Sequence, residues 1–331
     1  MKADRKSKIQ ARKNDSTPHG DNHQISPAIN PIQEHCLNLL SPELQKKVQE
    51  LEQIPLLPDW PEKTRGVPNL CLRSALFGVI RRGHRRAVKG DIIAAVKGLD
   101  IRYTGWQLNQ GDFDVMAQVL HLQNRHIERT SENYIRFQIK SFLSAIGRQT
   151  GKSGREWLKD CLRRLTATAL EVNVDIPNRS INGKYTYAGS LVDEFYYNDR
   201  EQTYFLKINP KLGELFDAGW TQLQWQQRIR LKTNLAKWLH GFYASHRNPY
   251  PMKVFTLRHL CGSSCGRLSD FRSKLRGALE ELLKANLLLS WTIDSEDKVH
   301  VRKQGPKLPH QEKQGGIAVV TRGHSSHTWG A

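Results

Sequence analysis

Three amphipathic segments followed by two alternating segments constrain the fold of residues 221–303 more than any other feature of the chain. Apolar residues recur every three or four positions through about 231–242, 256–261 and 267–282, which predicts three helices. Short apolar–polar alternations then flank a polar turn at 294–297, which predicts a β-hairpin. Three helices and a hairpin form a winged helix, whose third helix commonly enters the major groove of DNA.

The same plan precedes this block, in residues 71–220. Short alternating runs such as Ile101 and Tyr103 open it, and periodic apolar residues again predict three helices. These helices cover about 113–120, 138–147 and a segment that begins at Ser153. Ser153 and Glu156 have the spacing of a capping box, and alternating segments at 191–197 and 203–208 predict a second hairpin. We therefore predict an α+β protein with two tandem winged-helix domains, 71–220 and 221–303.

Both ends of the chain lack a core-forming pattern. Residues 1–70 are predicted to be disordered or linker, because the first 30 are polar and non-periodic and prolines punctuate 55–68. The leucine spacing over 33–53 is consistent with one amphipathic helix. Residues 304–331, rich in Gly, His and Gln, are predicted to be a disordered tail.

The net charge points to a polyanionic partner. The chain carries 51 Lys and Arg against 32 Asp and Glu, a formal charge of +19. Residues 1–60 hold eight of each sign, so the whole excess lies in 61–331, on the predicted domains rather than on a tail. A surface of this kind favours nucleic acid; the alternative is a merely solvated basic surface.

Composition also bears on the compartment. No stretch approaches the roughly 18 apolar residues of a membrane helix, and charges at Met1–Lys13 precede no apolar core, which argues against a signal peptide. Five cysteines in a chain of 331 residues fit reduced thiols better than a disulfide framework. We expect a cytoplasmic protein.

Each domain contains a helix with the side chains of a DNA-recognition helix. On the helix from Arg267, small and polar residues face away from the apolar stripe and are flanked by long basic ones, which suits contacts to base edges and phosphates. The predicted DNA contacts there are Arg267, Ser269, Asp270, Arg272, Ser273, Lys274 and Arg276. In the earlier helix they are Lys152, Arg155, Lys159 and Arg163, the last three spaced by four residues.

Like charges four residues apart repel each other in an isolated helix, a cost that a phosphate backbone would offset. The alternative for both helices is an ordinary solvated face. A further basic run at Arg81, Arg82, Arg85 and Arg86 is equally consistent with a solvated loop.

Three motifs that could carry chemistry are incomplete. The sequence GRQTGKS at 147–153 is one residue short of a P-loop and follows a helix rather than a strand. His259, Cys261 and Cys265 lack a CxxC pair and a clear fourth ligand for zinc. Tyr196 and Tyr197 have no accompanying His-x-His pair for DNA nicking. We therefore expect no catalytic site, no metal and no cofactor, and predict that the protein is not an enzyme.

Five short strings, in order, resemble the TrfA family of plasmid replication initiators. They are RSALF at 73–77, YTG at 103–105, LTATA at 165–169, SHRNPYP at 245–251 and CGS at 261–263. The resemblance covers roughly 55–303. It implies tandem winged helices that bind direct repeats, called iterons, at a plasmid origin. It also implies melting of an adjacent AT-rich segment and help in loading the host replicative helicase.

The resemblance further implies that the C-terminal winged helix gives most base readout, while the N-terminal one contacts the DNA backbone and takes part in dimerisation, in equilibrium with a monomer. Arg267 and Arg272 match basic family positions. Ser269 and Asp270 stand where the family has basic residues, and Ser273 and Gly277 where it has acidic ones. These departures concern which iteron sequence is read. Cys265 also departs from the family pattern.

The expected partners are double-stranded origin repeats, single-stranded AT-rich DNA, the host replication initiator and the replicative helicase. CLNLL at 36–40 loosely resembles the peptide with which proteins bind the sliding clamp, although Cys36 replaces the usual Gln; a leucine-bearing helix packed on its own domain is the alternative. The competing function is a winged-helix transcriptional repressor, since a fold does not fix function. Two unequal winged helices without an evident ligand-sensing domain favour the initiator.

Overall fold

The computed structural model describes residues 41–42, 57–81, 83–125, 134–175 and 184–303. The helix expected over 33–53, apart from Ser41 and Pro42, lies outside the described residues, as do the clamp-like motif at 36–40 and the tail from 304. No helix within the described ranges has the length and apolarity needed to span a membrane.

The C-terminal domain is a winged helix, as predicted. Its elements are α8 (Asn234–Ala244), β12 (Met252–Lys253), α9 (Val254–Leu260), α10 (Leu268–Lys284), β13 (Leu288–Ile293) and β14 (Lys298–Lys303). The apolar stripes of the three helices meet in one core, where Leu239, Leu257 and Leu279 are fully buried. β13 and β14 pair antiparallel as the wing, and the two-residue β12 extends the sheet in the order β12-β14-β13.

The first domain contains the same unit. Its elements are α4 (Gln110–Arg125), β6 (Ile135–Gln138), α5 (Ile139–Ala145), α6 (Lys152–Thr166), β9 (Val192–Asn198) and β10 (Thr203–Ile208). One strand lies between the first two helices, and the hairpin follows the third. The sheet order β6-β10-β9 therefore repeats the order of the second domain. This confirms two tandem winged helices in one chain.

The start of α6 differs from the prediction. Gly151, with extended backbone, is the residue at the N-cap, and no side chain caps the helix. Ser153 is consequently already inside the first turn, where it cannot form the capping box expected with Glu156. The Ser-x-x-Glu spacing alone does not show which residue is the N-cap of the helix.

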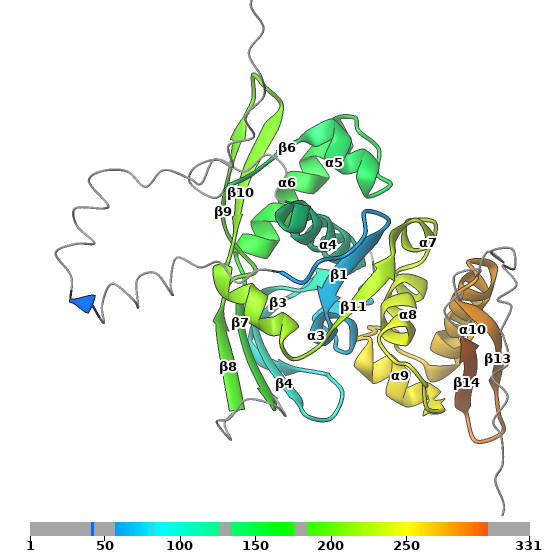
Figure 1. Cartoon of the computed structure of the whole chain (residues 1–331). Helices are drawn as coiled ribbons and strands as arrows, with labels where there is room; N and C mark the ends of the chain where they lie inside the picture. Colours follow the sequence, from blue (N-terminus) through cyan, green and yellow to red (C-terminus); the bar gives the residue numbers. More distant parts are fainter. Residues whose placement is uncertain (1–40, 43–56, 82, 126–133, 176–183, 304–331) are drawn as a thin grey trace, which may run out of the picture.

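A four-stranded antiparallel sheet is added to the first winged helix. Its strands, in the order β3-β4-β7-β8, are β3 (Ala87–Ile93), β4 (Leu99–Trp106), β7 (Ala169–Asp175) and β8 (Lys184–Gly189). Figure 1 shows it on the side of the molecule away from α10. The alternation at Ile101 and Tyr103 belongs to β4, and both side chains are buried. Because β4 pairs with β7, which follows α6, this sheet joins segments on both sides of the helical unit.

The first core extends past the boundaries predicted at residues 70 and 220. β1 (Thr64–Pro68) pairs antiparallel with β11 (Trp220–Gln224), and α3 (Asn69–Leu72) follows β1. Trp60, in the expected linker, is 1% exposed and belongs to the first core. That core extends to Trp225, whereas the second begins at Leu231. The prolines end the periodic pattern before β1. The strand β1 pairs with β11, about 150 residues away in the chain, and sequence periodicity cannot reveal a pairing at that distance.

Smaller elements complete the first domain. They are β2 (Phe77–Gly78) and β5 (Leu108–Asn109), which pair in parallel, the 3₁₀ helix η1 (Pro210–Phe216), and α7 (Trp225–Ile229) at the junction with the second domain.

Buried polar contacts join the two domains. Asp114 of α4 accepts from Arg228 Nε of α7 at 2.8 Å and is also paired with Lys237 of α8; Asp114 and Arg228 are almost completely buried. Trp238 Nε1 donates to the Ser74 carbonyl at 3.0 Å. An ion pair excluded from water is sensitive to the position of both partners, so these contacts fix α8 against α4.

Candidate nucleic-acid interface

Helix α10 presents the predicted contact residues to solvent. Phe271, Leu275, Leu279 and Leu282 face the core, with at most 1% of each exposed. The opposite side is exposed at six of the seven predicted positions, namely Arg267, Ser269, Asp270, Ser273, Lys274 and Arg276. Arg267 is the residue at the N-cap. The face thus combines small side chains with long basic ones at the start of the helix that a winged helix inserts into the major groove.

Arg272, the seventh position, is held by the wing. Its Nε and Nη2 donate to the Asp297 carboxylate at 2.8 and 2.9 Å. Asp297 lies in the turn between β13 and β14 with φ of 60°. The hydrogen bond from Arg272 lowers the pKa of Asp297. Sequence reasoning treated Arg272 as a free base-reading group and missed Asp297, because nothing in the pattern places the wing turn beside the middle of α10.

A tight turn sets the start of α10 against α9. Gly262 has φ of 59°, and a Cβ there would lie 2.9 Å from the Cβ of Ala75. Glycine therefore meets both a backbone and a space requirement. Arg258 Nη2 donates to the Gly266 carbonyl at 3.1 Å and ties α9 to the end of the turn. The CGS string at 261–263 thus lies in the turn that positions α10.

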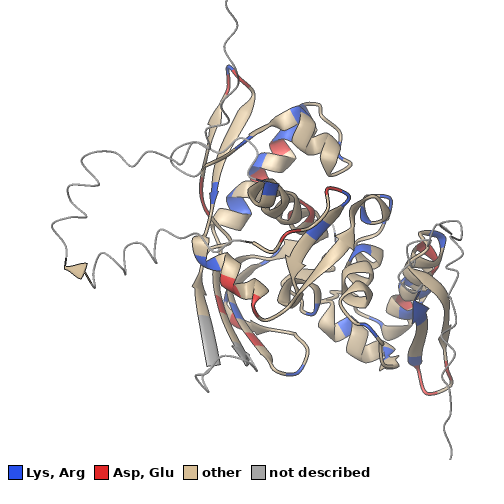
Figure 2. Cartoon of the chain, in the orientation of Figure 1, with Lys and Arg blue, Asp and Glu red and all other residues tan. Residues whose placement is uncertain are grey.

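Helix α6 carries the second predicted face. Leu158, Cys161, Leu162 and Leu165 are fully buried. The four predicted contacts, Lys152, Arg155, Lys159 and Arg163, are all exposed. Figure 2 shows Lys and Arg on the ribbons of α5, α6 and α10. Both winged helices therefore expose basic residues on their third helix.

Two of these four residues have protein partners. Arg155 Nη1 donates to Gln202 Oε1 at 2.7 Å, so it contacts the turn of the β9–β10 hairpin. Arg163 lies 3.3 Å from Asp160 in an exposed pair, which is worth little in water. No ion pair of Lys152 or Lys159 occurs in the part of the chain that the structure describes. The contact with Gln202, like that with Asp297, could not be predicted from the sequence, because it depends on how the β9–β10 hairpin packs against α6.

The arginines of the run at 81–86 lie in different environments. Arg81 and Arg86 are exposed, while Arg82 lies outside the described residues. Arg85 donates to the buried carboxylate of Asp112 at 2.9 Å, which also accepts from Arg164 at 2.8 Å. Arg164 therefore helps to hold α6 against α4, and Arg85 ties the segment before β3 to the same carboxylate of α4.

The incomplete motifs also have defined positions. In GRQTGKS, residues 147–151 lie in the turn between α5 and α6, and Lys152 and Ser153 begin α6. Burial raises the pKa of the Cys261 thiol to about 12. Within the described residues, no cluster of three or more His, Cys, Asp or Glu is arranged to hold a metal ion. Tyr196 lies on β9 and stacks on Phe205 at 4.6 Å between ring centroids.

Comparison with known proteins finds a relative in sequence. The chain is 29% identical over 266 residues to the plasmid replication initiator protein TrfA of Escherichia coli, an alignment covering 78% of this chain and 66% of the relative. It therefore spans slightly less than two thirds of that relative's length.

Two solved structures are also similar. Domains 2 and 3 of RctB match with a TM-score of 0.49 and 12% identity, over 72% of this chain and 98% of that one. The WH1 domain of a replication protein isolated from a multiple sclerosis patient matches with a TM-score of 0.24 and 12% identity, over 33% of this chain and 82% of that one. The family model described as TrfA protein matches residues 36–303, and the chain belongs to the TrfA family.

Proposed function

We propose that the protein initiates plasmid DNA replication by binding direct repeats at the origin. The observation that carries the proposal is the repeated unit: each of two winged helices exposes a basic third helix, in a chain of the TrfA family. The curated relative is named a plasmid replication initiator. A protein of this function acts in the bacterial cytoplasm.

The two helices support a division of labour. On α10, Ser273 and Gly277 let the backbone approach base edges, while Arg276 is long enough to reach guanine or phosphate. On α6 the four predicted contacts are long and basic, which suits phosphates and carries no direct sequence information. We assign base readout mainly to α10 and backbone contact mainly to α6.

Opening the origin is proposed to draw on binding and assembly, without a catalytic step in this protein. Duplex opening costs a mean of about 1.4 kcal/mol per base-pair step, more than one bound module supplies for a long tract. Several copies on adjacent repeats could bend the DNA and exploit negative supercoiling. The exposed AT-rich strand, the host initiator and the replicative helicase are the partners of that step. The sliding clamp and a monomer–dimer equilibrium are further expectations.

A permanganate footprint tests this proposal. A supercoiled plasmid carrying the repeats is incubated with the protein, without ATP, in the presence and absence of the host initiator. We expect reactive thymines in the adjacent AT-rich tract, and a closed tract on a plasmid reduced to one repeat. If the protein binds the full array tightly but never exposes unpaired thymines, with or without the host initiator, a transcriptional repressor becomes the better assignment of function.

A further inference from the structure

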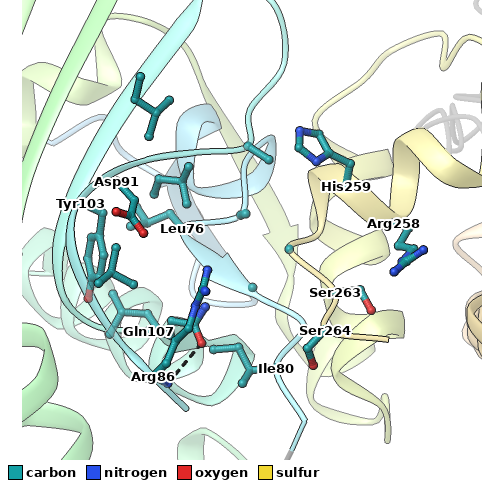
Figure 3. Close-up of a pocket in the computed structure, with 18 of the residues that line it drawn as sticks. Leu76, Ile80, Arg86, Asp91, Tyr103, Gln107, Arg258, His259, Ser263 and Ser264 are labelled. Atoms are coloured by element: carbon teal, nitrogen blue, oxygen red, sulfur yellow. Dashed lines mark hydrogen bonds between the residues drawn. The ribbon is translucent and has the colours of Figure 1, made fainter. Parts of the chain in front are cut away.

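A cleft of about 590 Å³ lies between the first domain and the start of the second domain's helix-turn-helix. One wall is formed by the β2–β3 region, and the other by α9 and the turn before α10 (Figure 3). Figure 3 shows Arg86 and Asp91 on the first wall and His259, Ser263 and Ser264 on the second. None of the predicted DNA contacts lines it.

The first wall is the edge of a sheet. Asp91, Ile92, Ile93 and Ala94 all line the cleft, although they are consecutive. Successive side chains of a strand point to opposite faces, so a consecutive run indicates that the strand's edge, with its backbone, borders the cleft. β3 is the outermost strand in the order β3-β4-β7-β8. Ala94 already accepts from the Ala75 amide, so the open part of the edge ends at Ile93.

An open edge normally carries protection against pairing with other chains. β3 has two such devices, the charged side chains of Lys89 and Asp91 and a bulge between them with Gly90 at φ of 71°. The bulge precedes the residues that line the cleft. After the bulge, the segment from Asp91 to Ile93 pairs regularly with β4 on one side. Its other side, at the edge of the sheet, is therefore suited to accept a further strand.

The side chains of the cleft favour an acidic, partly apolar occupant. Ile92 and Phe255, on opposite walls, are 65% and 63% exposed, so both leave apolar surface for an occupant of the cleft to cover. The lining contains two arginines and two histidines against the single carboxylate of Asp91. Its floor includes Leu76, Val88 and Leu108, which offer nothing to a phosphate or a base edge. This composition favours a protein segment over nucleic acid.

We propose that this cleft binds an extended, acidic peptide segment of a partner protein. The segment adds to the edge of β3 as a further strand, which supplies main-chain hydrogen bonds, and it places an apolar side chain between Ile92 and Phe255. Its carboxylates face Arg86 and Arg258. This site is separate from both recognition helices, so it can be occupied whether or not the proposed origin binding is correct.

Fluorescence anisotropy with a defined probe tests the site on the full chain. The probe is a labelled peptide of about eight residues in which Glu alternates with Val, a usual strand length. One control peptide replaces Glu with Lys, and another carries N-methyl groups that remove the backbone donors on one edge. The protein variants are Ile92→Glu and Phe255→Glu, with Leu289→Glu as the matched control, since Leu289 is 53% exposed and does not line the cleft.

We expect saturable binding of the Glu–Val probe, at least about tenfold weaker in either cleft variant because apolar burial is lost, and unchanged in Leu289→Glu. Both control peptides should bind much more weakly. Thermal unfolding and circular dichroism verify that the variants are folded. The inference is overturned if no saturation occurs up to about 1 mM, if the methylated probe binds equally well, or if duplex DNA displaces the probe. A dimer lost only in Ile92→Glu, without probe binding, would instead assign the edge to a second copy.

Discussion

Arg272 and Asp297 connect the middle of α10 to the turn of the wing. Both side chains are about one third exposed, and their bidentate geometry is well suited to an arginine–carboxylate pair. The guanidinium that matches a basic family position therefore directs two of its N–H donors to the wing. We therefore expect Arg272 to act on DNA binding through the position of the wing.

That arrangement predicts a non-additive pair of substitutions. Arg272→Ala and Asp297→Ala should each weaken origin binding, and the double variant should lose little more than either one, because both remove the same connection. DNA affinity of the four proteins, measured by anisotropy, gives the coupling. Fully additive losses would mean that Arg272 contacts DNA independently of Asp297, as the sequence alone suggested.

The predicted contacts of α10 and α6 differ in side-chain type. Substitutions on α10 should therefore change base discrimination, and substitutions on α6 should change overall DNA affinity. Arg276→Ala on α10 should cost about 1–3 kcal/mol on the specific site and relax discrimination at one base pair. Lys159→Ala on α6 should weaken all sequences about equally and lower the salt slope by about one unit. Binding to a panel of single-base-pair variants checks both. If Lys159→Ala altered base preference and Arg276→Ala did not, the assignment would be reversed.

Local periodicity was sufficient to predict both helix-turn-helix units and both wings, because their apolar stripes and alternations lie within single segments. The face of α10 followed from the stripe through Phe271 and Leu279. The pairing of β1 with β11 and of β4 with β7 could not be predicted, since each depends on a partner distant in sequence. The same reason hid the Arg272–Asp297 and Arg155–Gln202 contacts.

At the scale of the whole molecule, the junction around Asp114 determines how the two winged helices are placed relative to each other. Arg228 also donates to Gln110 Oε1 at 2.7 Å and lies over the ring of Phe113. Burial lowers the pKa of both Arg228 and Lys237. Two cations thus share one carboxylate in a site largely closed to water.

Removing that carboxylate should be costly. Asp114→Asn leaves two buried cations without a counter-charge, and we expect a loss of about 3–5 kcal/mol in the free energy of unfolding. Asp160→Asn is the matched control, because its pair with Arg163 is exposed on both sides and should contribute less than about 1 kcal/mol. Urea unfolding measures both. Equal, small losses would show that Asp114 does not hold the junction.

The same junction predicts an acid sensitivity. Burial, followed by the charges of Arg228 and Lys237, lowers the pKa of His240 from 6.5 to about 3. His240 is therefore protonated below about pH 6.5 in the unfolded chain, but only below about pH 3 in the folded chain. Stability should fall as the pH drops through that window, by up to about 1.4 kcal/mol per pH unit. His240→Gln should flatten this slope in urea unfolding at several pH values; an unchanged slope would assign the effect to other groups.

The last prediction uses the charge of the whole interface. Six predicted contacts are exposed and make no ion pair within the described residues: Lys152, Arg155, Lys159, Arg267, Lys274 and Arg276. If each neutralises one phosphate, counterion release gives a slope of about −5 in log affinity against log salt. Affinity should then fall about 10³-fold between about 50 and 200 mM salt, and further if other basic side chains also engage. Titration of an origin-repeat duplex across this range measures the slope. A nearly salt-independent affinity would contradict the interface, because recognition would then depend on groups other than the two basic faces.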